Sequence, residues 1–241
     1  MNKQKLVRFI NKYYLNGLAQ SVILNSNSEQ QKLTTKFVSD DKTLLGVVEM
    51  DKWVFEDATI GIYTTEQLLK LLSVVDEDIK VDLQKFEDKV TSIKITDSTS
   101  SVNYMLSDPS IIVNPPQMQN IPEFELKIDV TPNLIEKFTS GKAALTEVTT
   151  FTVITGESKT NLVIGYSSVN TNRVNIPVQT SKFSPIDNVS FNADYFSEIL
   201  SANKECESAT LEISSEGLAK ISFKVDDFST TYWLVATTEV D

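Results

Sequence analysis

The sequence contains no histidine among its 241 residues and only one cysteine. Without histidine, there is no Ser-His or Cys-His catalytic pair, no histidine-ligated zinc and no imidazole general base. Cys206 lies between Glu205 and Glu207, whose negative charges disfavour the thiolate, so it is a poor nucleophile. A lone cysteine cannot form an internal disulfide, so we expect a reducing, cytoplasmic location.

Long apolar runs are also lacking. No run approaches the roughly 20 residues that span a bilayer, and residues 1–12 lack the apolar centre of a secretory signal. Only seven glycines are present, and none of them forms a phosphate-binding loop. We therefore expect no membrane partner and no nucleotide cofactor.

Adjacent carboxylates are the remaining candidates for chemistry. They occur at Glu56-Asp57, Asp76-Glu77-Asp78 and Asp226-Asp227. Each cluster lies where a turn is expected, and solvated turns explain them better than Mg²⁺ or Ca²⁺ sites. We predict no catalytic residue, no metal site and no cofactor. An enzyme would have to work with carboxylates such as Asp76 and Asp226 alone.

Positive charge is scarce, and it is concentrated at the start of the chain. The net charge is −11, yet four cations precede the first acidic residue, Glu29. Residues 3–16 read as an amphipathic helix that ends near Gly17, with its apolar side chains opposite a basic stripe. A lone basic stripe is usually a solvated surface. The acidity of the remaining chain favours a nucleic-acid contact instead.

A repeated unit organises the sequence. Tyr63 is followed by a helix pattern and three alternating strands that end at Leu106, and Phe191 begins the same series. Phe191 lies 128 positions after Tyr63, and the same spacing relates Leu72 to Leu200. A register kept across one helix and three strands indicates two copies of one domain.

The second half contains a further helix with strong start signals. Thr131 is a candidate N-cap, Pro132 occupies the first helical position, and Gly141 is expected to end the helix. Segments of alternating apolar residues, which predict strands, surround this helix. Similar segments follow the first helix. Each half therefore contains two strand-and-helix units, which predicts an α+β fold with antiparallel sheets.

A connector separates the halves. Residues 107–122 hold four of the seven prolines, which exclude a central strand or a helix interior. Ile111, Ile112 and Val113 interrupt this polar stretch. Three aliphatic residues in a linker predict that it packs on a neighbouring sheet or borders a groove.

Two tandem domains, a proline-rich connector, an acidic body and a basic helix together resemble DNA polymerase sliding clamps, the processivity factors of replication. The local sequence is most similar to the clamps of T-even-like bacteriophages, and the architecture is similar to the PCNA-type clamp. The resemblance is carried by Phe55–Leu83, by Asp108-Pro109-Ser110 and by Tyr232–Ala236. It covers nearly the whole chain.

The resemblance implies two similar clamp domains, residues 1–108 and 123–241, joined by a connector at 109–122. Antiparallel sheets would form the outside, and two helices of each domain the inner face. Three chains would close head to tail around double-stranded DNA without reading its sequence. The DNA-facing residues would be Lys5, Arg8, Lys12, Lys70, Lys137, Lys142 and Lys204. The fourth helix departs from this pattern, because Asp194 and Glu198 stand where cations are expected.

The resemblance also implies two kinds of protein contact. The subunit interface would pair residues 101–106 of one chain with residues 173–178 of the next, through Val102, Tyr104, Leu106, Val174, Ile176 and Val178. A groove would receive short C-terminal peptides of the DNA polymerase and of an ATP-driven clamp loader. Its lining residues would be Ile111, Ile112, Val113 and Val235.

Three functions remain open at this point. The first is the non-catalytic clamp of a homotrimeric ring. The second is a duplicated, β-rich structural or adaptor protein of a virion. The third is a metal enzyme that uses carboxylates alone. Ring stoichiometry and retention on closed circular DNA separate the first from the second, and loss of an activity on mutating Asp76 or Asp226 would indicate the third.

Overall fold

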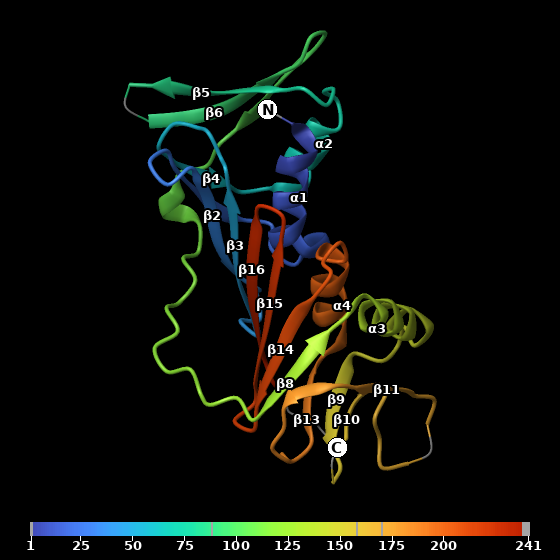
Figure 1. Ribbon diagram of the computed structural model, residues 1–241. Helices are drawn as coiled ribbons and strands as arrows, with labels where there is room; N and C mark the ends of the chain where they lie inside the picture. Colours follow the sequence, from blue (N-terminus) through green and yellow to red (C-terminus); the bar gives the residue numbers. More distant parts are fainter. Residues whose placement is uncertain (1, 88, 158, 170, 238–241) are drawn as a thin grey trace. The chain divides into compact units, whose positions relative to one another are not determined.

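The computed structural model describes residues 2–87, 89–157, 159–169 and 171–237 (Figure 1). Contacts divide the chain into two units. The first unit runs to Asp40 and then from Val47 to Pro116, and the second comprises Asp41–Gly46 and the chain from Gln117 onward. Within these ranges, no helix is long and apolar enough to cross a membrane.

The first unit combines two helices with two antiparallel sheets, in the strand orders β3-β2-β1-β4 and β5-β6-β7. Its elements are α1 (Lys3–Tyr14), η1 (Leu15–Gly17), β1 (Val22–Asn27), β2 (Lys32–Val38), β3 (Leu44–Asp51), β4 (Ala58–Ile62), α2 (Thr65–Leu72), β5 (Lys80–Phe86), β6 (Lys89–Thr96), β7 (Ser101–Met105) and η2 (Pro109–Ile111).

The second unit has the same plan with more strands, in the orders β11-β10-β9-β13 and β12-β8-β14-β15-β16. Its elements are β8 (Leu126–Val130), α3 (Pro132–Ala144), β9 (Thr150–Thr155), β10 (Thr160–Ile164), β11 (Val174–Val178), β12 (Thr180–Lys182), β13 (Val189–Asn192), α4 (Ala193–Ala202), β14 (Ala209–Ser214), β15 (Leu218–Val225) and β16 (Phe228–Val235).

The predicted repeat is confirmed by the pairing register of the strands. Leu83 of β5 pairs with Ile93 of β6, and the residues 128 positions later, Leu211 and Ile221, pair in the same way. The hairpin β6–β7 maps onto β15–β16, and β1–β2 maps onto β9–β10, with the same spacing. Since a shift of one residue would turn every side chain to the other face, identical registers mean identical inward-facing positions.

The sheets differ at one place. The strands β8 and β12 extend the second unit's sheet beyond β14, whereas β5, the counterpart of β14, is a terminal strand among those described. The expected four strand-and-helix units are therefore not equivalent: β8, β4 and β13 each lead into a helix. The chain before α1 instead contributes an isolated bridge between Asn2 and Asp78.

Local sequence explains where the helices begin. The Thr131 side chain accepts a hydrogen bond from the Leu134 amide, which confirms the predicted N-cap, and Asn192 caps α4 in the same way by accepting from the Tyr195 amide. The prediction that Gly141 ends its helix is wrong, because α3 continues to Ala144. Gly141 permits close packing: a Cβ there would lie 3.0 Å from a methyl group of Val174.

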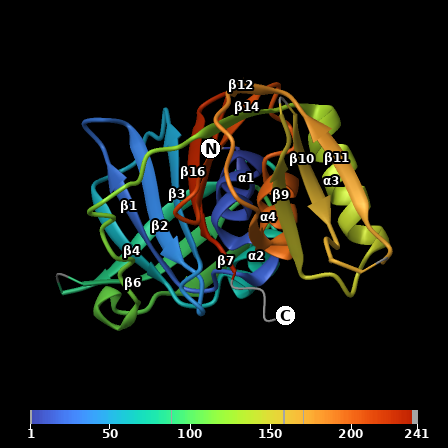
Figure 2. The same cartoon turned by 90° about the horizontal axis from the view of Figure 1, so that it is seen from below.

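Each unit has its own core between the helices and the sheets. In the second unit, α3 packs on β11, and α4 packs on β9 and β13 (Figure 2). Four fully buried rings meet there, and the centroid of Phe138 lies 4.7 Å from that of Phe196 and 5.1 Å from that of Phe151. In the first unit, α1 packs against α2, with Phe9 and Tyr13 in edge-to-face contact at 5.9 Å. Buried aromatic clusters of this kind dominate core energetics.

The start of the connector is fixed to the first unit by a close backbone approach. The amide of Ser107 donates to the carbonyl of Gly61 at 3.0 Å. A Cβ at position 61 would overlap the Ser107 carbonyl oxygen, so glycine is required there. Asp108 then caps η2 by accepting from the Ser110 amide at 3.0 Å.

Candidate nucleic-acid and partner surfaces

The cations at the start of α1 are held by the first unit. The ammonium of Lys3 donates to the carbonyl of Val75 at 2.6 Å and lies 3.7 Å from Glu77. The ammonium of Lys5 donates to the carbonyl of Asp51 at 3.1 Å. Both side chains are half-buried, so the helix presents less charge to solvent than its sequence suggests.

Two of the predicted DNA-facing lysines are buried. Lys12 is 1% exposed and Lys142 is 8% exposed, so neither presents its ammonium on the surface of the chain. Lys142 lies 2.7 Å from Asp194 and donates to the carbonyl of Thr146 at 3.2 Å. A buried ammonium needs such partners. The expectation that Lys12 and Lys142 face DNA is therefore corrected: the structure shows them as interior cations.

Three other predicted lysines are exposed. Lys70 on α2, Lys137 on α3 and Lys204 after α4 all extend into solvent, and Arg8 on α1 is half-buried. The ammonium of Lys70 contacts Glu66 one turn earlier, which partly neutralises it and raises the pKa of Lys70 through the side-chain hydrogen bond and the negative charge.

The predicted interface strands are sheet edges. β7 ends the order β5-β6-β7 and β11 ends the order β11-β10-β9-β13, so each has one edge without a partner among the strands described. Terminal strands expose unpaired backbone groups that can pair with another chain. The half-buried side chains of these two segments are Val102, Leu106, Val174 and Val178.

The remaining two predicted interface side chains point into their own units. Tyr104 and Ile176 are each 3% exposed. The hydroxyl of Tyr104 accepts from the amide of Thr64 and donates to its carbonyl, both at 3.1 Å. Burial raises the pKa of Tyr104. Both side chains pack inside their own units, so we no longer expect them to contact a neighbouring chain.

The connector alternates between exposed and buried side chains. Ile111 and Val113 are exposed, whereas Ile112 is 6% exposed and lies beside Gly61. Val113 borders a hollow of about 90 Å³ against β1 and β2 that Ile23 also lines. The prediction that the linker packs on a sheet is confirmed within the first unit. Val235 belongs to the second unit, where it is exposed.

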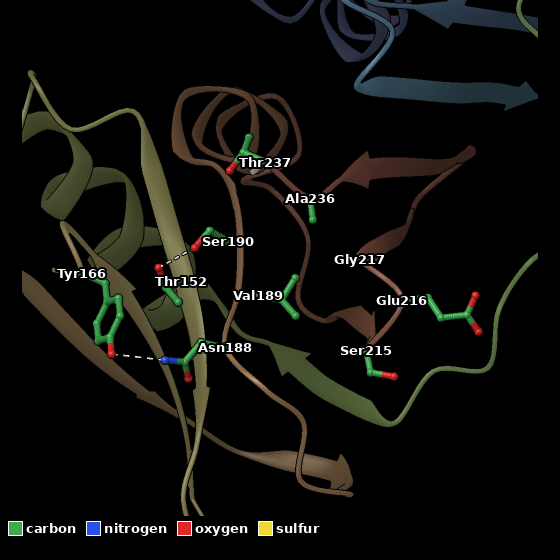
Figure 3. A pocket seen from close by; sticks show the side chains of 10 residues that line it. All are labelled: Thr152, Tyr166, Asn188, Val189, Ser190, Ser215, Glu216, Gly217, Ala236 and Thr237. Carbon is green, nitrogen blue, oxygen red and sulfur yellow. Dashed lines mark hydrogen bonds between the residues drawn. The ribbon is translucent and has the colours of Figure 1, made fainter. Parts of the chain in front are cut away.

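A larger pocket lies in the second unit, where Ala236, the residue after Val235, is one of its lining residues (Figure 3). Its volume is about 340 Å³. Five separate segments build it, and the sequence pattern gave no sign of it because most of its residues are small or polar. The residues that line it are Thr152, Tyr166, Asn188, Val189, Ser190, Ser215, Glu216, Gly217, Ala236 and Thr237.

Hydrogen bonds fix the rim of this pocket. The amide of Thr237 donates to the carbonyl of Ser190 at 2.9 Å, and the amide of Ala236 donates to that of Gly217 at 2.8 Å. The hydroxyls of Ser190 and Thr152 lie 2.9 Å apart. The buried hydroxyl of Thr237 has no hydrogen-bond partner in the described chain. The pocket therefore offers a polar site beside the exposed aliphatic Val235.

The acidic turn at Asp57 is linked by a hydrogen bond to the turn at Ser28. Asp57 accepts from the amide of Ser28 at 2.6 Å, and this bond lowers the pKa of Asp57. No group of three or more His, Cys, Asp or Glu side chains that could hold a metal ion occurs in the described part of the chain. Cys206 is 3% exposed.

Sequence comparison gives no relatives: no protein-family model matches the chain, and no curated protein matches it. Solved structures do match. Proliferating cell nuclear antigen (PCNA) from Entamoeba histolytica matches with a TM-score of 0.74 and 14% identity, over 98% of this chain and 96% of that chain. PCNA from A. fulgidus, in a structure with the C-terminal region of FEN-1 bound, gives a TM-score of 0.76 and 14% identity, over 100% and 98%. The chain therefore has the PCNA-type clamp fold, as the resemblance implied.

Proposed function

We propose that this chain, with its PCNA-type fold, is a non-catalytic DNA sliding clamp of the T-even-like bacteriophage kind. The observation that carries the proposal is the match of the complete two-unit architecture to two PCNA structures. The quoted segments Phe55–Leu83 and Tyr232–Ala236 support the phage assignment by resemblance. Residues 1–108 and 123–241 would be the two clamp domains, with the connector at 109–122.

The proposed ring has three chains and closes head to tail through β7 of one chain and β11 of the next. Both strands are sheet edges, and pairing them would remove two unpaired backbone rows. The contact is heterologous, so it forms a ring only if the rotation closes. Two units per chain would place six units around the ring.

The DNA contact would be diffuse. Duplex DNA carries about one charge per 1.7 Å of axis, and a ring that slides cannot hold single phosphates tightly. We assign this role to the exposed cations Lys70, Lys137 and Lys204, together with Lys5 and Arg8. The net charge of −11 leaves the remaining surface acidic, which would keep DNA off it.

The partner groove is proposed at the connector and at the end of β16. A. fulgidus PCNA binds the C-terminal region of FEN-1. By analogy, the polymerase and the ATP-driven loader would place C-terminal peptides against Ile111, Val113 and Val235. The polar pocket beside Val235 would take a hydrogen-bonding side chain of such a peptide.

The test is topological retention on DNA. The protein is incubated at high concentration with a nicked circular plasmid, so that chains can assemble around the duplex without a loader. After gel filtration, a clamp should remain with the circle and be released when the plasmid is cut once. Equal loss from circular and linear plasmid would contradict the proposal and favour a virion adaptor.

Two sets of variants separate the contributions. Val102→Asp with Val178→Asp, at the proposed joint, should abolish retention. Val54→Asp, an exposed valine outside the proposed joint, should not. Replacing Lys70, Lys137 and Lys204 by glutamate should shorten retention several-fold and flatten its dependence on salt. Unchanged retention in this triple variant would contradict the assigned DNA contact.

A further inference from the structure

The outer edge of β5 is the place where the two units differ most. The counterpart of β5 in the second unit is β14, and the edge of β14 is filled by β8 in antiparallel pairing. Among the strands described in the first unit, none lies against the edge of β5. The repeat thus has a strand position that is occupied in one copy and open in the other.

The open position has consequences for burial. In β14, Leu211 is fully buried and Ala209 is 8% exposed. Their counterparts, Leu83 and Val81 in β5, are only half-buried. The same two inward-facing positions therefore keep apolar surface in contact with water where the neighbouring strand is missing.

The residues at the start of α1 lie near the edge along which a strand added to β5 would run. The amide of Lys3 donates to the carbonyl of Glu77 at 2.8 Å, and Asn2 forms an antiparallel bridge with Asp78. In the second unit, β8 runs along β14 and leads directly into α3. The repeat would place Asn2 opposite Val81, as Val130 lies opposite Ala209, whereas Asn2 bridges Asp78, so the start of the chain stops short of β5 and leaves the edge of β5 open.

We propose that the edge of β5 binds an extended peptide segment of a partner protein by antiparallel strand addition. The register follows from the repeat. Ile128 and Val130 of β8 lie opposite Leu211 and Ala209, so the incoming strand places aliphatic residues opposite Leu83 and Val81.

The charge of β5 specifies the residue between those two aliphatics. Asp129 of β8 lies opposite Thr210, whose counterpart in β5 is Asp82. The carboxylate of Asp82 pairs with the exposed ammonium of Lys80 at 2.8 Å. A carboxylate opposite Asp82 would still be repelled by it, and a lysine or arginine there would be attracted and would share it with Lys80. The partner segment therefore reads aliphatic, basic, aliphatic. This site is separate from the connector groove and does not depend on ring closure.

The probe is a fluorescein-labelled peptide of residues 124–131 that carries Asp129→Lys, added to the full-length protein. Anisotropy should show weak binding, and amide NMR shifts should move along Lys80–Phe86 but not along β7. The same peptide with Ile128→Pro should not bind, because proline cannot donate to the strand pairing. Absent shifts, or shifts confined to other strands, would overturn the proposal.

A charge exchange gives the second readout without removing buried atoms. The wild-type protein should prefer the lysine peptide over the Asp129 peptide by about two- to five-fold. The variant Asp82→Lys should reverse that preference. Val54→Lys, which places a charge at an exposed position outside this sheet, should leave it unchanged. Failure of Asp82→Lys to reverse the preference would overturn the assigned register.

Discussion

The helices α1 and α3 are counterparts in the repeat. They share their apolar positions but differ in their charged positions. Leu6 and Ile10 of α1 correspond to Leu134 and Phe138 of α3, and all four are buried. On the opposite face, Arg8 corresponds to Glu136. The apolar positions are shared because both helices pack on the same kind of sheet. The charged positions differ between the two helices, so the fold alone does not place the DNA contact.

The largest effect on stability is expected from a substitution in the aromatic core of the second unit. Phe138→Ala should lower the free energy of unfolding of that unit by about 3–5 kcal/mol, through lost burial and the cavity left behind. Trp233 lies in the second unit and Trp53 in the first, so single-tryptophan variants report each unit during denaturation.

Two comparisons control this experiment. Ile10→Ala, the counterpart substitution in α1, should destabilise the first unit by about 2–5 kcal/mol. The tryptophan of the other unit should report a smaller change in each case. If Phe138→Ala moved the Trp233 transition by less than about 1 kcal/mol, the described ring cluster would not be the core of this unit.

An intermediate effect is expected at the interior cation of α3. Asp194→Asn removes the carboxylate 2.7 Å from the nearly buried ammonium of Lys142. Because Asp194 is itself half exposed, the loss should be about 0.5–1.5 kcal/mol, less than for a fully buried pair. Chemical denaturation of the second unit measures it.

The matched variants show whether the unpaired charge is the cause. Adding Lys142→Met to Asp194→Asn should recover most of the stability, since no ammonium is then left without its carboxylate. Ser201→Ala, at an exposed position of α4, should have little effect. No recovery in the double variant would mean that Asp194 stabilises the unit in another way.

The two units should also differ, by a smaller amount, in how their stability depends on pH. Hydrogen bonds from the amides of Asp76 and Thr99 and from Ser100 hold the pKa of Asp97 well below its usual range. The unfolded chain therefore takes up the proton first as the pH falls. The stabilisation is present above about pH 4 and is lost below it. The counterpart position in the second unit is Val225.

Thermal unfolding at pH 6 and pH 3 checks this prediction. The first unit of the wild type should lose more stability on acidification than the first unit of Asp97→Asn. The second unit should respond alike in both proteins. An equal acid response of both first units would show that these hydrogen bonds do not stabilise the carboxylate.

Much of the fold was predictable because its signals are local or periodic. The alternation of the strands, the caps at Thr131 and Asn192, and the spacing of 128 residues all lie in the sequence itself. Gly141 misled the prediction because glycine commonly ends helices. Here, its missing side chain makes room for Val174, and this reason lies in the tertiary packing.

The candidate sites were less predictable for a related reason. A helical pattern counts every lysine as polar surface, but Lys142 is drawn inside by Asp194, which lies on another helix. The polar pocket is assembled from segments between Thr152 and Thr237, and none of them has a recognisable motif. The connector was read from its prolines, whereas the burial of Ile112 depends on Gly61.

The proposal as a whole depends on two open strand edges that face each other in successive copies of the chain. The mass of the native protein in solution, measured by native mass spectrometry over a range of concentrations, tests this most directly. The account predicts a particle of three 26.9 kDa chains, which Val102→Asp with Val178→Asp converts to single chains. A particle that remains a single chain or a dimer at every concentration would contradict it.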